Sequence, residues 1–154
     1  MSGPVDRVVA ALRSGGAAGE MRRFEGAVPT AAAAADALGC PVGAIANSLV
    51  FDADGEPLLV LASGVHRVDT GKVAALVGAA RVRRARPEFV LAATGQEVGG
   101  VAPVGHPAPL RTVVDTDLAV HPVVWAGGGD HHTMFATTYE ELLRLTDGTA
   151  AAVA

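Results

Sequence analysis

Apolar residues recur at helical spacing in several stretches of the chain, and a capping residue, proline or glycine bounds each of them. Thr30 caps an alanine-rich helix that Gly39 ends, and Pro87 opens a later one. Thr138 and Glu141 have the spacing of a capping box for the last helix, and we expect the alanine-rich tail beyond it to be frayed. The expected helices cover residues 5–12, 30–38, 69–77, 87–94 and 139–145.

Two pairs of apolar runs enclose glycine-containing turns and predict β-hairpins. In "NSLVFDADGEPLLVLAS" (47–63) the runs flank Asp54 and Gly55, a strong signal for a tight turn. The second pair is "PVVWAGGGDHHTMFATT" (122–138), and further strands are expected in "MRRFE" (21–25) and "LRTVVDTDLAV" (110–120). Because strands and helices do not alternate as regular β–α–β units, the pattern predicts an α+β domain with a partly closed, barrel-like sheet.

The composition limits the cellular compartment and the binding partners that we expect. A length of 154 residues suits a single domain, here 1–154 with a core at about 5–148. The net charge of −4 excludes a strong global field for nucleic acid or membrane, so basic contacts must be local. Cys40 is the one cysteine, which rules out a disulfide scaffold. With no signal peptide and no apolar run of transmembrane length in the sequence, we expect a soluble, cytoplasmic protein.

Two kinds of short motif resemble phosphate-binding sites, and each also has a purely structural explanation. "GVHRVDTGK" (64–72) resembles a phosphate-binding loop, but six residues rather than four separate its glycines, and Val73 follows where a hydroxyl is needed. It is interpreted as a turn and a helix start. Two basic clusters could contact phosphates: the four arginines of "RVRRAR" (81–86) and the pair Arg22 and Arg23. The alternative is that these side chains are solvated on exposed strand faces.

The segment "DHH" (130–132) combines an acid with two histidines. In a strand, His131 and His132 point to opposite faces, which disfavours a shared metal ion. The other histidines show no short ligand spacing, and a structural zinc needs a cysteine cluster. A general acid/base or substrate-orienting role for Asp130 or His131 is the stronger functional hypothesis, and an exposed polar turn is the alternative.

The segment "GGVAPVGHP" (99–107) holds three glycines and two prolines in nine residues. Prolines fix the backbone, and glycines leave its amides uncovered. Fixed, uncovered amides can hold a carbonyl oxygen or a developing oxyanion, so the loop is a candidate wall of a site. A rigid connection between a helix and a strand explains the same pattern.

Four segments occur in a characteristic order: "IANSLVF" (45–51), "PLLVLASG" (57–64), "TGQEVGGVAPVGHP" (94–107) and "GGGDHHTMFATTYEELLRLT" (127–146). Together they resemble the YbaK/ProX family of free-standing aminoacyl-tRNA deacylases, whose domain is also the editing module inserted in bacterial prolyl-tRNA synthetase. The resemblance implies a curved, mostly antiparallel sheet flanked by helices. It also implies hydrolysis of the ester between a mischarged amino acid and the 3′ adenosine of tRNA, without cofactor or metal. The implied partners are the 3′ acceptor end of an aminoacyl-tRNA and an aminoacyl-tRNA synthetase, with no membrane contact.

The resemblance also assigns site residues. Gly99, Pro103 and Gly105 match the family's Gly-x-x-x-Pro-x-Gly stretch, which forms one wall of the aminoacyl pocket. The implied catalytic residues are Asn47, Gly105, Asp130 and His131. The implied substrate-binding residues are Phe24, Ser48, Gly99, Gly100, Val101, Pro103 and His106.

One position departs from the family. Its strand motif reads Lys-Ser/Thr-Leu-Val-Phe, whereas this chain has Asn47 before Ser48 and its one lysine at Lys72. Asparagine offers hydrogen bonds but no charge, which weakens a phosphate contact. From the resemblance we expect a trans-editing hydrolase acting on a small amino acid such as alanine or cysteine, on tRNA-Pro, and Asn47 is the reason to keep a catalytically silent alternative. The alternatives are a catalytically silent tRNA- or aminoacyl-binding module and a metal-assisted hydrolase that uses Asp130 and the histidines.

Overall fold

The central hairpin is fixed by its turn. In the computed structural model, which describes residues 3–17 and 19–154, strand β2 (Ile45–Ala53) pairs antiparallel with β3 (Glu56–Ser63). Asp54 and Gly55 both have positive φ, 53° and 90°, as a two-residue turn that matches the twist of a hairpin requires. The expected hairpin is therefore confirmed.

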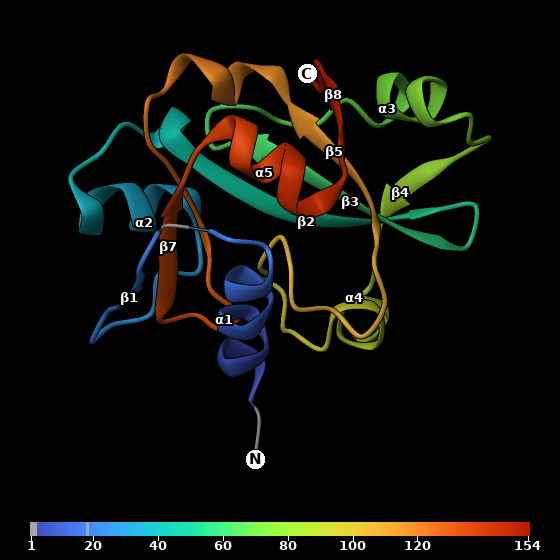
Figure 1. Ribbon diagram of the computed structural model, residues 1–154. Coiled ribbons are helices and arrows are strands. Elements are labelled where there is room, and N and C mark those ends of the chain that lie inside the picture. Colours follow the sequence, from blue (N-terminus) through green and yellow to red (C-terminus); the bar gives the residue numbers. More distant parts are fainter. Residues whose placement is uncertain (1–2, 18) are drawn as a thin grey trace.

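The hairpin lies at the centre of one mixed sheet (Figure 1). The strand order is β1-β7-β6-β2-β3-β5-β8, and β4 pairs with β2 beside this path. Pairs β1–β7, β6–β7, β2–β3 and β2–β4 are antiparallel, and the other three are parallel. The α+β class is confirmed, and the sheet stays open. The remaining strands are β1 (Met21–Arg23), β4 (Val82–Arg84), β5 (Arg111–Asp115), β6 (Val124–Gly127), β7 (Thr133–Thr137) and β8 (Thr149–Ala151).

The expected helices are present, and their caps explain where they begin. Thr30 Oγ1 accepts a hydrogen bond from the Ala33 amide, and Thr138 Oγ1 accepts one from Glu141. The helices are α1 (Pro4–Ser14), α2 (Ala31–Leu38), α3 (Thr70–Val77), α4 (Pro87–Thr94) and α5 (Tyr139–Thr146), with short 3-10 turns at Val42–Ala44 and Thr116–Val120. In the described part of the chain, no helix is long and apolar enough to cross a membrane.

Both faces of the central hairpin are buried. Leu59 and Leu61 point to the face that α1 and α5 cover, where they pack with Val8 and Leu142. Leu58 and Val60 point to the opposite face, in a second core that includes Val73 of α3. This alternation explains why "PLLVLAS" is continuously apolar, since each residue faces a packed layer.

The expectation of a frayed tail is wrong. Residues Thr149–Ala151 form β8, which pairs parallel with β5. Val153 is fully buried, and its carbonyl accepts a hydrogen bond from the Asp69 amide at 2.8 Å. Small apolar residues fit against the edge of the sheet, so an alanine-rich end can be ordered by packing that its composition alone does not reveal.

Candidate functional site

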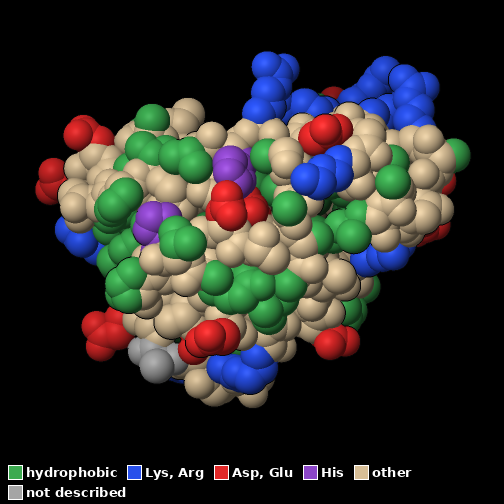
Figure 2. Space-filling view, turned by 90° about the horizontal axis from the view of Figure 1, so that it is seen from above, with side chains coloured by type: hydrophobic (Ala, Val, Ile, Leu, Met, Phe, Trp, Pro, Cys, Tyr) green, Lys and Arg blue, Asp and Glu red, His purple; other side chains and the backbone are tan. Residues whose placement is uncertain are grey.

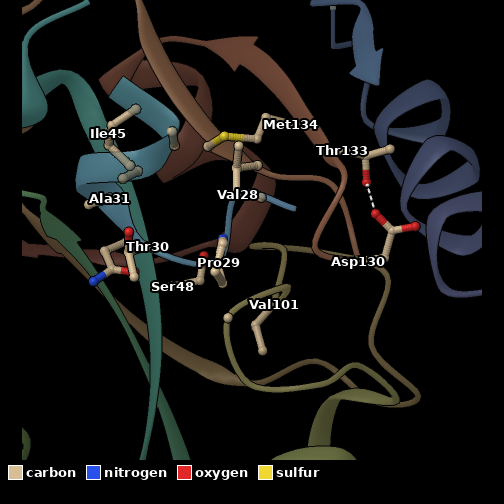
Figure 3. Close-up of a pocket in the computed structure, with 15 residues that line it drawn as sticks. Val28, Pro29, Thr30, Ala31, Ile45, Ser48, Val101, Asp130, Thr133 and Met134 are labelled. Carbon is tan, nitrogen blue, oxygen red and sulfur yellow. Dashed lines mark hydrogen bonds between the residues drawn. The ribbon is translucent and has the colours of Figure 1, made fainter. Parts of the chain in front are cut away.

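A small cavity lies where β2 meets the segment before α2 and the loop after α4 (Figure 3). Its volume is about 40 Å³, enough for roughly three water molecules. Ala34, Ile45 and Met134, all buried, form its apolar end. The other lining residues described are Val28, Pro29, Thr30, Ala31, Ala46, Asn47, Ser48, Gly99, Val101, Gly127, Asp130 and Thr133.

The segment that leads into α2 is pinned to the second hairpin. The amides of Phe24 and Val28 donate to the carbonyls of His132 and His131, each at 2.7 Å. These bonds place Pro29 and Thr30 against the cavity, so the amino-terminal end of α2 faces it (Figure 3). The amides in the first turn of a helix carry a partial positive charge, which favours a polar or anionic group there.

Ser48 lines the cavity and carries a hydroxyl without a partner. Its Oγ is buried, and no hydrogen-bond partner lies within reach among the described residues. Leaving a buried hydroxyl unpaired costs about 1–3 kcal/mol. Figure 3 shows Ser48 beside Pro29 and Thr30, with Asp130 and Thr133 on the opposite side. A bound ligand or water that bonds to this hydroxyl would recover the cost.

The amides from residue 99 to residue 102 alternate between unpaired and paired. The Gly100 amide donates to the Glu97 carbonyl at 2.9 Å, and the Ala102 amide donates to Gln96 Oε1 at 2.7 Å. In the part of the chain that the structure describes, the amides of Gly99 and Val101 meet no acceptor, and both residues line the cavity. These two amides are available to a carbonyl oxygen.

Asp130 is the ionisable residue among the described ones that line the cavity. Its Oδ1 accepts hydrogen bonds from the His132 amide and from Thr133 Oγ1, both at 2.8 Å. Partial burial raises the pKa of Asp130, but these two bonds, with the charge of Arg23 at 3.9 Å, outweigh it and hold the pKa below its usual value. The cavity therefore carries one fixed negative charge at neutral pH.

Five of the residues implied by the resemblance line the cavity, and three others lie elsewhere. Asn47, Ser48, Gly99, Val101 and Asp130 line it. The structure places Pro103, Gly105 and His106 on a separate cavity between α1 and α5. Gly105 packs against Val8 of α1 there, so a Cβ at this position would come within 3.0 Å of the helix backbone.

The remaining implied residues support the cavity from behind. Gly100 packs on the backbone of Asp130, where a Cβ would come within 2.8 Å of the carbonyl carbon. His131 Nε2 donates to the Val98 carbonyl at 2.8 Å and thereby braces the residue before Gly99. Phe24 belongs to the apolar cluster under α2 and lies 5.2 Å from the Arg22 guanidinium.

His106 is a half-buried histidine bonded to its own loop. Its Nε2 donates to the Ala102 carbonyl at 2.8 Å. Burial lowers the pKa of His106, and the bond to Ala102, which raises it, does not compensate. The side chain thus contributes packing and one hydrogen bond to the loop.

A wider groove of about 220 Å³ continues from the small cavity along β2. Asn47 and Ser48 line both spaces, and Arg84 of β4 lines the far part of the groove. Arg84 has no ion-pair partner among the described residues, whereas Arg83 pairs with Asp52 at 3.4 Å. Figure 2 shows positive side chains gathered along one margin of the molecule, as expected for a local basic contact.

Sequence reasoning missed a second polar cluster. His66 Nδ1 lies 2.7 Å from Asp115 Oδ2, and His66 Nε2 lies 3.0 Å from Asp117 Oδ2. Asp115 is buried and also accepts from the Ser63 amide at 3.0 Å. Each ring nitrogen of His66 meets a different carboxylate, so this side chain links the two acids. No spacing in the sequence could reveal it, since 49 residues separate His66 from Asp115.

The sequence is similar to a protein family and to several known proteins. A family model described as the aminoacyl-tRNA editing domain matches residues 25–145. YwhH of Bacillus subtilis is 30% identical over 124 residues, which are 80% of this chain and 78% of that protein. The proline–tRNA ligase of Nitratidesulfovibrio vulgaris (strain Hildenborough) is 40% identical over 81 residues, 53% of this chain. The matched part spans only 14% of that ligase.

Solved structures agree with the fold along nearly the whole chain. A candidate trans-editing enzyme for prolyl tRNA synthetase is 41% identical, with a TM-score of 0.92 and coverage of 99% of this chain and 98% of that one. The hypothetical protein APE2540 is 30% identical, with a TM-score of 0.88 and coverage of 96% and 98%.

Proposed function

Since the chain belongs to the aminoacyl-tRNA editing domain family, we propose that it is a trans-acting deacylase for a small amino acid mischarged onto tRNA. Its relatives include proline–tRNA ligases and a candidate trans-editing enzyme for prolyl tRNA synthetase, so tRNA-Pro is the proposed carrier. The observation that carries the proposal is the cavity wall at Ser48 and Val101. Two residues that line the cavity carry an unpaired buried hydroxyl and an unpaired amide, and the cavity ends in apolar side chains.

The proposed reaction is hydrolysis without a covalent intermediate. A water oxygen attacks the ester carbonyl carbon, and the carbonyl oxygen becomes an oxyanion that the Val101 amide and the Ser48 hydroxyl stabilise. The bond to the ribose oxygen then breaks. One proton of the attacking water passes to the ribose oxygen and restores its hydroxyl, the other passes to solvent, and the amino acid leaves as a carboxylate. An aminoacyl ester is already activated, so holding water and carbonyl in place is the main task of the protein.

Asp130 is proposed to bind the substrate by charge rather than to act as a base. Its lowered pKa makes it a weak proton acceptor at neutral pH, and its Oδ1 is occupied by two donors. A fixed carboxylate on the wall opposite Ser48 instead attracts the α-ammonium group of the ester (Figure 3). His131 is proposed to support Gly99 through Val98.

The size of the cavity favours a small amino acid. A volume of about 40 Å³, closed by Ala34, Ile45 and Met134, accommodates the side chain of alanine, serine or cysteine but not a long one. The apolar end offers a longer polar side chain no hydrogen-bond partner, and burying such a group unpaired is costly.

A deacylation panel tests the function. Purified protein is incubated with tRNAs charged with alanine, cysteine, serine or proline, beside an Asn47→Lys variant. We expect release of at least one small amino acid by the parent protein. If the parent binds charged tRNA without turnover and Asn47→Lys gains activity, the silent-module alternative replaces the proposal. Loss of activity on chelation would favour the metal-assisted alternative instead.

Arg84 provides a test of how the tRNA end is held. We propose that its unpaired guanidinium contacts a phosphate of the acceptor end in the groove beside Asn47. We expect Arg84→Gln to raise KM for charged tRNA about 3- to 10-fold and to reduce the salt dependence of binding by about one phosphate contact.

Arg83→Gln is the matched control, because its guanidinium already pairs with Asp52. It removes the same charge from the neighbouring position of the same strand. Equal effects of the two variants would show that only net charge matters and would remove the assigned contact at Arg84. The measurement is KM and the slope of log binding constant against log salt concentration for both variants.

A further inference from the structure

Gln96 is the buried side chain that holds the shape of the glycine-proline loop. It follows Gly95, which ends α4, and it is only 1% exposed. Its Oε1 accepts from the Ala102 amide at 2.7 Å, and its Nε2 donates to the Val104 carbonyl at 3.3 Å. Only this orientation of the carboxamide satisfies both contacts, since one needs an acceptor and the other a donor.

The two hydrogen bonds of the Gln96 carboxamide form a clasp on the loop, and the residues from which Gln96 extends are fixed as well. The Gln96 amide donates to Thr94 Oγ1 at 2.9 Å, and that hydroxyl donates to the Val90 carbonyl at 2.7 Å in the last turns of α4. Thr94 is fully buried. Gln96 therefore connects the fixed end of α4 to the loop, so the position of the loop depends on that of α4.

The clasp pairs the amide next to that of Val101. Gly100 and Ala102 turn their amides inward, to Glu97 and Gln96. The intervening Val101 amide is left without an acceptor among the described residues, and Val101 lines the cavity. The Ala102 carbonyl is held as well, by His106 Nε2 at 2.8 Å, so hydrogen bonds hold the peptide unit before the Ala102 Cα and the one after it.

We infer that Gln96 is a positioning residue for deacylation, because its carboxamide clasp aims the Val101 amide at the ester carbonyl. This rests on the proposed function, since it assigns the cause of the amide's direction at the same site. Gln96 touches neither the cavity nor the proposed substrate, and it acts through Ala102. Displacing a stabilising donor by about 1 Å costs up to about 100-fold in rate.

The first test uses Gln96→Met, which keeps the length of the side chain and removes both hydrogen bonds. We expect kcat to fall about 10- to 100-fold with KM changed less than about threefold, because the lost interaction acts on the transition state. Thr112→Val is the matched control: it removes a hydroxyl that donates to the Leu110 carbonyl at 2.9 Å, away from the cavity, and should leave kcat unchanged.

The second test uses Gln96→Glu, which makes the clasp depend on pH. The protonated acid can accept from Ala102 and donate to Val104, whereas the carboxylate only accepts and repels the Val104 carbonyl. Burial raises the pKa of such a glutamate above its ordinary value of about 4.3. We expect kcat relative to the parent to be near one at pH 5 and at least about tenfold lower at pH 8.

Amide hydrogen exchange supplies a readout that does not depend on turnover. In Gln96→Met the Ala102 amide should exchange at least about tenfold faster than in the parent. Unchanged exchange at Ala102, an unchanged kcat in folded Gln96→Met, or a flat pH ratio for Gln96→Glu would each overturn the inference. A parent protein that hydrolyses none of the charged tRNAs overturns the proposed function instead, and with it the catalytic part of this inference.

Discussion

Ser48→Ala is expected to lower kcat for deacylation about 10- to 100-fold while leaving the protein as stable as the parent or slightly more so. The two effects have one cause. The Ser48 hydroxyl is buried without a partner in the described part of the chain, so removing it ends a desolvation cost rather than a hydrogen bond. With substrate bound, the same hydroxyl gains its partner in the developing oxyanion. Steady-state kinetics measures the change in kcat, and the midpoint of thermal unfolding measures the change in stability.

Ser63→Ala is the matched control in the same hairpin. Its hydroxyl donates to the Gly43 carbonyl at 2.9 Å, so its loss should cost about 1 kcal/mol of unfolding free energy and leave kcat unchanged. Ser48→Ala is expected to show the reverse, a lower kcat with no loss of stability. If Ser48→Ala is destabilised like Ser63→Ala and keeps its activity, the hydroxyl has a structural partner and no role in the reaction.

Ser48 also separates two mechanisms. A serine that attacks the ester itself would form an acyl-enzyme and give a burst of released tRNA before steady turnover. No described base lies within hydrogen-bond distance of Ser48 Oγ to activate it as a nucleophile. A linear time course and residual activity of Ser48→Ala are therefore the expected results.

Much of the fold follows from local chemistry. Asp54 and Gly55 fix the central hairpin, and Thr30 and Thr138 fix the starts of two helices, because each effect acts over two or three residues. The family resemblance is confirmed by the match to the editing-domain family over residues 25–145. These features depend on residues close together in the chain, which a single sequence displays directly.

The features that could not be predicted depend on long-range packing. The tail is ordered because β8 pairs with β5 and Val153 enters the core. The motif "GGVAPVGHP" reads as one wall, yet Gly99 and Val101 face the small cavity while Pro103 and Gly105 face another, on the side of α1. Gln96 bonds to Ala102 and Val104 in the part of the loop between the two cavities, and these contacts lie six and eight residues away in the chain.

Gly100→Ala is expected to abolish most of the activity, with a loss of about 100-fold or more in kcat/KM. A Cβ at Gly100 would lie 2.8 Å from the carbonyl carbon and 2.9 Å from the Cα of Asp130, which are backbone atoms that cannot move aside singly. The loop must therefore shift away from Asp130, which separates the Val101 amide from the charge on the other wall. The same crowding should lower the free energy of unfolding by about 1–3 kcal/mol.

Gly148→Ala distinguishes loss of stability from loss of the site. A Cβ there would lie 2.7 Å from Thr146 Oγ1 and 3.0 Å from a Val114 methyl group, at the junction of α5 and β8 and outside the cavity lining. We expect a destabilisation no larger than that of Gly100→Ala, because these are side-chain atoms, and nearly unchanged kcat/KM when both variants are assayed well below their unfolding temperatures. Because both glycines are crowded and only Gly100 adjoins the cavity, full activity of Gly100→Ala would show that the loop's contact with Asp130 is dispensable. The reacting ester would then have to lie elsewhere than between Val101 and Asp130.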